Sequence, residues 1–185
     1  MKKLFKITLF FTLSFAAGNL FAQQDERDKG IEFYNKGEYQ QAAEILQKAI
    51  ETDDQDRKSW LYLGMSYANL KNDKQAVKAF KKADKIELKA PTEADAKETS
   101  VKITSKPQVR YTDTARMNNV QGTVKLAVEF GADGMIKSVY AFQKLPDGLT
   151  ENSIETAKKV KFEPATKDGK AVSSIGILFY SFSIY

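Results

Sequence analysis

Apolar and polar residues alternate along a stretch near the start of the last third of the chain. The apolar positions of this stretch are Val124, Leu126, Val128 and Phe130. A period of two with one apolar face predicts a half-buried β-strand. Asp133-Gly134 follows directly, and an Asp-Gly pair readily takes the positive backbone angles of a tight hairpin turn. The pattern therefore predicts a second, antiparallel strand over residues 136–142.

The spacing of apolar residues becomes helical after this hairpin. Apolar residues recur at helical spacing from Leu149 to Val160, and Thr150 is the predicted N-cap of this helix. Pro164 cannot continue a helix, and Asp168-Gly169 is expected to turn the chain into a closing strand over residues 171–185. With a short helical segment before the first strand, the expected order is helix, strand, strand, helix, strand.

The first half of the chain repeats itself with a period of 34 residues. Aligning residues 23–56 with residues 57–90 superimposes five pairs: Gly30 with Gly64, Phe33 with Tyr67, Ala42 with Ala76, Leu46 with Phe80, and Ala49 with Ala83. Small residues such as Gly64 let two helices approach, and large ones such as Phe80 fill the space between them. We therefore predict two helical hairpins, followed by a polar linker or capping segment over residues 91–106. Direct packing of the C-terminal domain on the repeats is the alternative that the sequence leaves open.

The 34-residue period resembles that of the tetratricopeptide (TPR) repeat. Residues 107–185 resemble the C-terminal domain of TonB-family energy transducers. The residues that match the family pattern in order and spacing are Pro107, Tyr111, Ala115, Gly122, Val124, Asp133, Gly134, Ala157, Phe162, Pro164, Ala165, Gly169 and Phe182. Thr112 departs from the pattern, because the family usually has a proline there. The two resemblances imply an α+β chain with two modules: all-α TPR hairpins, then two helices on a three-stranded antiparallel sheet.

Residues 1–22 have the pattern of a secretory signal peptide. A basic start with three lysines precedes an apolar stretch over residues 7–17, and Leu20-Phe21-Ala22 forms a cleavage site before Gln23. We therefore expect an exported, periplasmic protein. The apolar stretch is shorter than the roughly 20 residues of a membrane-spanning helix. An uncleaved anchor in the inner membrane is the alternative.

The composition removes several kinds of chemistry. The chain has no Cys and no His, so it has no disulfide, no thiolate and no imidazole base. Its Asp and Glu residues are scattered without a paired arrangement. We therefore predict no catalytic residue, no cofactor and no metal site. The net charge of +5 includes the three lysines of the signal peptide, and no basic stripe with interleaved aromatic residues indicates nucleic-acid binding.

The closing strand is the predicted functional element of the C-terminal domain. The resemblance implies that an extended peptide from an outer-membrane receptor adds as a strand beside it, so that backbone hydrogen bonds supply affinity. The residues expected to form this peptide-pairing strand are Ile175, Ile177, Phe179, Ser181, Ser183 and Tyr185. In the alternative interpretation, the chain is an envelope scaffold whose C-terminal domain only packs or forms a homodimer through this strand.

The resemblance to TPR proteins implies a second partner protein. In that family the first helix of each repeat lines a concave groove. The residues expected to line the groove here are Ile31, Tyr34, Asn35, Leu61, Met65 and Asn69. Asn35 and Asn69 each lie near a helix end as well, where an amide side chain commonly caps backbone carbonyls, and we favour the capping role for both.

Overall fold

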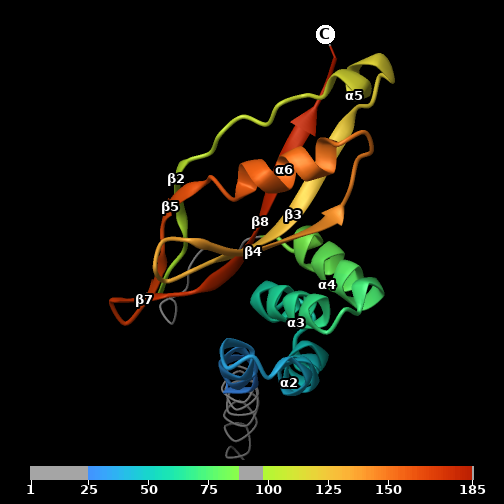
Figure 1. The fold of residues 1–185 in the computed structure, drawn as a ribbon. Helices are drawn as coiled ribbons and strands as arrows, with labels where there is room; N and C mark the ends of the chain where they lie inside the picture. The colour runs from blue at the N-terminus through green and yellow to red at the C-terminus, as the bar shows by residue number, and fades with distance from the viewer. Residues whose placement is uncertain (1–24, 88–97, 185) are drawn as a thin grey trace, which may run out of the picture.

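The computed structural model describes residues 25–87 and 98–184 of the chain (Figure 1). The predicted signal peptide, residues 88–97 of the region joining the two modules, and Tyr185 lie outside the described residues.

Residues 25–87 form the helical module. A helix over residues 25–35 is followed by α2 (Tyr39–Thr52), α3 (Arg57–Asn69) and α4 (Asp73–Lys85). The side chain of Asp56 caps α3 by accepting a hydrogen bond from the Ser59 amide, and Asn72 caps α4 in the same way. Six consecutive residues of α3, from Leu61 to Ser66, are buried, because this helix packs against α2, α4 and the sheet.

The predicted close approach of the paired helices is visible at two equivalent glycines. A Cβ atom added at Gly64 would lie 2.6 Å from the ring of Phe80, and one added at Gly30 would lie 2.6 Å from Leu46. Both distances are too short for a real side chain. The large residue opposite therefore requires glycine at each position. The two glycines lie 34 residues apart, at equivalent places in the two hairpins.

The C-terminal domain is built on a three-stranded antiparallel sheet, as predicted. Its strands are β3 (Gly122–Phe130), β4 (Ile136–Gln143) and β8 (Ser174–Phe182), in the order β4-β3-β8. Helix α5 (Asp113–Met117) precedes the sheet, and α6 (Leu149–Ala157) lies across one face (Figure 1). The predicted alternation is confirmed, because Val124, Leu126 and Val128 are fully buried in the core beneath α6.

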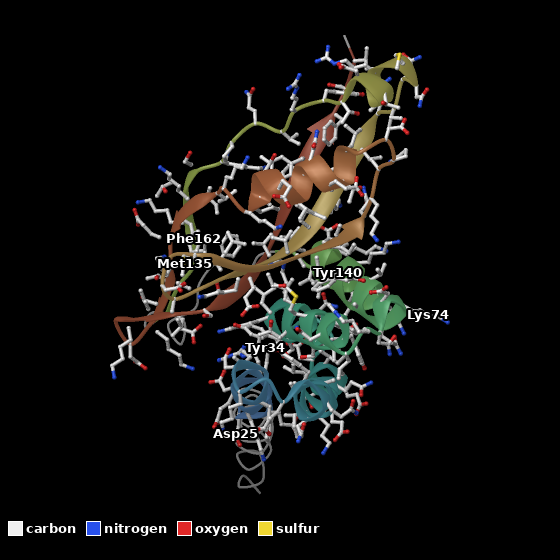
Figure 2. The ribbon with its side chains drawn as sticks, in the orientation of Figure 1. Asp25, Tyr34, Lys74, Met135, Tyr140 and Phe162 are labelled. Carbon is white, nitrogen blue, oxygen red and sulfur yellow. The ribbon has the colours of Figure 1, made fainter. Side chains whose placement is uncertain are left out.

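Phe162 closes this core. Its ring lies edge-on to that of Phe130, with the ring centres 4.9 Å apart, so its role is packing (Figure 2).

Two local predictions were wrong. Helix α6 begins at Leu149 and its N-cap is Gly148, which has a positive φ of 80°. The Thr150 hydroxyl bonds instead to the amide and carbonyl of Leu145, so it fixes the preceding loop. The closing strand is also interrupted: residues Lys170–Val172 form a separate strand, β7, and β8 starts at Ser174.

Part of the predicted linker belongs to the C-terminal domain. Residues Glu98–Thr99 (β1) pair with β6 (Ala165–Lys167), which also pairs with β7. Residues Lys102–Ser105 (β2) pair with β5 (Lys161–Glu163). These short strands carry few apolar residues, so only their backbone pairing with a distant segment makes them strands.

The second face of the sheet packs directly on the helical module, which settles the question that the sequence left open. Ala127, Phe142 and Ile175 belong to the same buried core as the residues of α3 and α4. The centre of the Phe80 ring of α4 lies 5.5 Å from the ring centres of both Tyr140 and Phe142 on β4. The sheet is thus a middle layer, with α6 on one side and the helical module on the other (Figure 1).

Candidate functional site

The outer edge of β8 is the candidate site. Strand β8 pairs with β3 on one side, and within the described residues no strand pairs with its other side. The Gln143 side chain donates to the carbonyl of Thr123, which therefore points from β3 toward β4. Successive backbone groups of a strand point to opposite edges, so the amide and carbonyl groups of Val124, Leu126 and Val128 point toward β8. Their partners in β8 are Tyr180, Leu178 and Gly176.

This register determines which backbone groups of β8 face outward. The backbone groups of Gly176, Leu178 and Tyr180 point toward β3. The outward-facing groups therefore belong to the residues that alternate with these three: Ile175, Ile177, Phe179 and Ser181. Four of the six residues predicted for peptide pairing therefore present their amide and carbonyl groups at the open edge. Ser183 lies beyond the end of β8 at Phe182, and Tyr185 is outside the described residues.

The side chains of these four residues have different surroundings. Ile175 is buried, and Ile177 is partly buried; both pack on the helical module. Phe179 is 57% exposed, and Ser181 is also exposed. The apolar surface that remains available beside the edge is therefore concentrated at Phe179.

Lys106 lies at the centre of this edge, and sequence reasoning missed it. Its Nζ donates a hydrogen bond of 2.7 Å to the Phe179 carbonyl, which confirms that this carbonyl points outward. The same nitrogen is 4.7 Å from the ring centres of both Phe179 and Tyr180. Burial lowers the pKa of Lys106. Lys106 stood in the predicted linker, and only the folded chain brings it to a strand 73 residues away.

The predicted TPR groove is occupied by the sheet. Tyr34, Leu61 and Met65 are buried, and Ile31 packs partly buried against the same core. The Tyr34 hydroxyl donates to Glu129 of β3 at 2.9 Å. Burial, together with the nearby Glu129 carboxylate, raises the pKa of Tyr34. In this arrangement the concave surface of the helical module holds the C-terminal domain.

The two asparagines of the predicted groove lie at its margin. Asn69 donates to the Met65 carbonyl at 2.9 Å, as expected of a residue that caps the end of a helix. Asn35 is exposed.

The comparisons with known proteins agree with both resemblances. The family model described as Gram-negative bacterial TonB protein C-terminal matches residues 107–184. Residues 107–184 are a TonB C-terminal domain. A tetratricopeptide repeat model matches residues 58–89, which contain nearly all of α3 and α4. No curated protein matches the chain significantly.

Two solved structures of TonB C-terminal domains are also similar to the chain. The domain from Pseudomonas aeruginosa is 22% identical, with a TM-score of 0.39, over 46% of this chain and 88% of that one. The domain from Helicobacter pylori is 16% identical, with a TM-score of 0.32, over 41% of this chain and 69% of that one.

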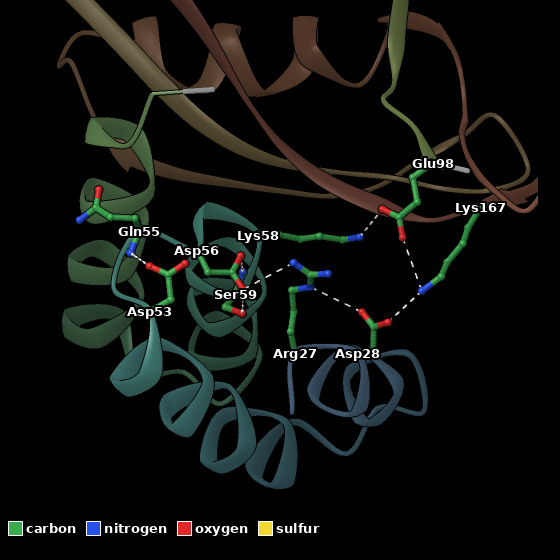
Figure 3. Close-up of polar contacts among 9 residues, drawn as sticks. All are labelled: Arg27, Asp28, Asp53, Gln55, Asp56, Lys58, Ser59, Glu98 and Lys167. Carbon is green, nitrogen blue, oxygen red and sulfur yellow. Dashed lines mark hydrogen bonds and ion pairs between the residues drawn. The ribbon is translucent and has the colours of Figure 1, made fainter. Parts of the chain in front are cut away.

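A cluster of charges joins the TPR module to the TonB C-terminal domain at the end opposite α4 (Figure 3). Lys167 of β6 forms ion pairs with Asp28 at 2.9 Å and with Glu98 at 3.5 Å. Lys58 of α3 pairs with Glu98 at 3.0 Å. Burial by itself raises the pKa of Asp28, but the hydrogen bond and charge of Lys167 outweigh burial and leave this pKa below its ordinary value. The pKa of Glu98 is lowered in the same way, chiefly by Lys58.

This charge cluster predicts a loss of stability in acid. A carboxylate whose pKa is lowered by folding stabilises the protein above its unfolded pKa, about 3.9 for Asp, and stops doing so as the pH falls through the folded value. The wild type should therefore lose stability below about pH 4, and Asp28→Asn should lose less than the wild type over the same range. Because Asp28 is partly exposed, we expect a difference below about 1 kcal/mol. Urea unfolding at pH 7 and pH 3 measures it.

The control for this prediction is Glu163→Gln, which removes a more exposed ion pair with Lys102 at 3.2 Å. It should follow the wild-type pH dependence. An Asp28→Asn protein that loses as much stability in acid as the wild type would show that the cluster does not tie the two domains together.

The described residues hold no group of three or more acidic, His or Cys side chains arranged to bind a metal ion. Among the same residues, no helix has both the length and the apolar character needed to cross a membrane.

Proposed function

We propose that this protein is a non-catalytic binding protein of the Gram-negative envelope, and that its TonB C-terminal domain captures an extended receptor peptide by strand addition along β8. The observation that carries the proposal is the open edge at Ile175, Ile177, Phe179 and Ser181, where the described residues supply no pairing strand. An extended peptide placed there would gain main-chain hydrogen bonds regardless of its sequence, and its side chains would meet the exposed Phe179 ring. The match to the TonB C-terminal family makes an outer-membrane receptor the expected source of the peptide.

The TPR module would then act first as a support for the sheet. It covers the face opposite α6, so the edge strand is held between two packed layers. Preorganisation of this kind lowers the entropic cost of adding a strand. A second partner protein that uses the predicted groove would have to displace the sheet from Tyr34, Leu61 and Met65.

Ser181→Pro is the sharpest test of strand addition. Proline removes the outward amide of an exposed edge position, where it is tolerated because this amide has no partner within the sheet. We expect Ser181→Pro to weaken peptide binding roughly tenfold to a hundredfold, because the incoming carbonyl loses its donor and meets the proline ring. Titration calorimetry should use a peptide panel that covers the periplasmic N-terminal segments of the organism's outer-membrane receptors.

The matched control is Ser181→Ala, which keeps the amide and should bind as the wild type does. Thermal unfolding of both variants checks that the fold is retained. Peptide binding that survives Ser181→Pro unchanged would place the peptide elsewhere, and binding by no receptor peptide would reject the proposed function.

The alternative function is an envelope scaffold in which the TonB C-terminal domain only packs or dimerises. The observation in its favour is the extensive packing of the sheet on the TPR module. Capture of proteins from an envelope extract, with the full exported chain as the bait, distinguishes the scaffold from peptide capture. Outer-membrane barrels retained by the wild type and lost with Ser181→Pro support peptide capture, whereas recovery of soluble proteins or of the chain itself supports the scaffold.

A further inference from the structure

Lys106 stands where the backbone of an added strand would have to be. A strand added to β8 would run roughly 4.8 Å away, with its amide nitrogen about 2.9 Å from each outward carbonyl. The Lys106 Nζ already lies 2.7 Å from the Phe179 carbonyl. The ammonium group therefore takes the place of the incoming donor at the middle of the four outward-facing residues.

The rings beside Lys106 show that it lies in line with the sheet. Phe179 and Tyr180 are consecutive residues, so their side chains lie on opposite faces of β8. Lys106 Nζ is equally distant, 4.7 Å, from the two ring centres. A nitrogen placed between both faces is at the edge itself, in the path of an added strand. Burial there lowers the pKa of Lys106, in keeping with its partly covered position.

The backbone beneath Lys106 is anchored. The preceding residues, Lys102–Ser105, form β2 and pair with β5, and Pro107 follows directly. A residue before proline is restricted to extended conformations. The side chain is therefore directed to the edge by a fixed segment of chain, which distinguishes it from an ordinary surface lysine.

We propose that Lys106 is an intramolecular guard of the β8 edge, which competes with strand addition until an incoming peptide displaces it. The proposal rests on strand addition at β8 as the function of this site. Edge strands in soluble proteins are commonly protected by lysine against unwanted pairing. In the free protein, Lys106 would also keep two copies of this chain from pairing through their exposed Phe179 edges.

Lys106→Met tests the guard, with Lys106→Arg as its matched control. Methionine keeps an unbranched chain that packs on the two rings, but it has neither a donor nor a charge. Arginine keeps both. For the receptor peptide that binds the wild type, we expect Lys106→Met to lower the Kd about tenfold, since one competing charge-assisted hydrogen bond is lost. Lys106→Arg should stay within about twofold of the wild type.

Two measurements need no peptide. Sedimentation equilibrium should show Lys106→Met self-associating at concentrations where the wild type is monomeric, and adding Ser181→Pro should reverse this. The carbonyl carbon resonance of Phe179 should move in Lys106→Met and hardly at all in Lys106→Arg, because only methionine removes the hydrogen bond.

The outcomes distinguish a failure of the Lys106 guard from a failure of strand addition at β8. If Ser181→Pro abolishes peptide binding while Lys106→Met changes neither the peptide Kd nor self-association, strand addition stands and the guard is rejected. If no peptide binds, the proposed function fails, and the guard stands or falls on the self-association of Lys106→Met. A Phe179 carbonyl resonance that is the same in the wild type and in Lys106→Met overturns the guard outright.

Discussion

Phe80→Ala is expected to lower the free energy of unfolding by about 3–5 kcal/mol, the usual cost of truncating a buried phenylalanine. Phe80 is fully buried and lies where the core of the TPR module meets the sheet. Its ring contacts the rings of Tyr140 and Phe142, so the cavity would open on both domains at once. Urea unfolding followed by far-ultraviolet circular dichroism measures the change.

The control for this prediction is Gly64→Ala, whose effect on the free energy of unfolding should change sign between the wild type and Phe80→Ala. Gly64→Ala places a methyl group 2.6 Å from the Phe80 ring, so in the wild type we expect a net loss of stability from overpacking. In the Phe80→Ala background that clash is gone. There, the same substitution should stabilise α3 by about 0.5–1 kcal/mol, because alanine is a better helix former than glycine. Additive effects of the two substitutions would show that Gly64 and Phe80 are not in contact.

Ala127→Glu is expected to separate the TPR module from the sheet. Ala127 is fully buried in the central strand β3, on the face that packs against the helices. A carboxylate without a partner at such a position costs about 3–5 kcal/mol, and undocking of the two layers would return it to water. We expect the wild type to unfold in a single calorimetric transition and Ala127→Glu to unfold in two, and we expect the radius of gyration from small-angle scattering to increase in the variant.

Ala132→Glu is the matched control, since it makes the same change at an exposed position of the β3–β4 turn. Its effect should stay within about 0.5 kcal/mol. A single transition and an unchanged radius of gyration for Ala127→Glu would mean that the two layers do not depend on this contact.

The undocked variant also tests what the predicted groove can bind. With the sheet removed, Tyr34, Leu61 and Met65 would become accessible. A partner protein retained by Ala127→Glu but not by Ala132→Glu would show that the sheet competes with that partner for the groove. If neither variant retains a partner, the groove serves only to hold the sheet.

Local patterns were sufficient to predict the helices of both modules and the three main strands of the sheet. The alternation around Val124 to Phe130 and the Asp133-Gly134 turn predicted the β3–β4 hairpin, and the 34-residue period predicted closely packed helical hairpins with glycine at equivalent positions. The N-cap of α6 was predicted wrongly because Thr150 has the right chemistry for a cap, but the helix begins after Gly148, which adopts a positive φ without a steric cost.

The candidate site was predictable only in part. The alternation of the closing strand placed Ile175, Ile177, Phe179 and Ser181 in one set, but only the register with β3 shows that their backbone groups face outward. Lys106 offered no signal, because a lysine in a polar segment is ordinarily a solvated residue. Its importance depends on a hydrogen bond across 73 positions of the chain.

The sequence by itself determined the two modules, their helices and main strands, and the family of the C-terminal domain, because each depends on the spacing of neighbouring residues. The tertiary structure alone decided that the sheet fills the TPR groove, that Lys106 covers the open edge, and that Lys167 joins the domains through Asp28 and Glu98. The physical reason is that these contacts are specified by shape and charge between segments far apart in the chain. No periodicity within either segment records its partner.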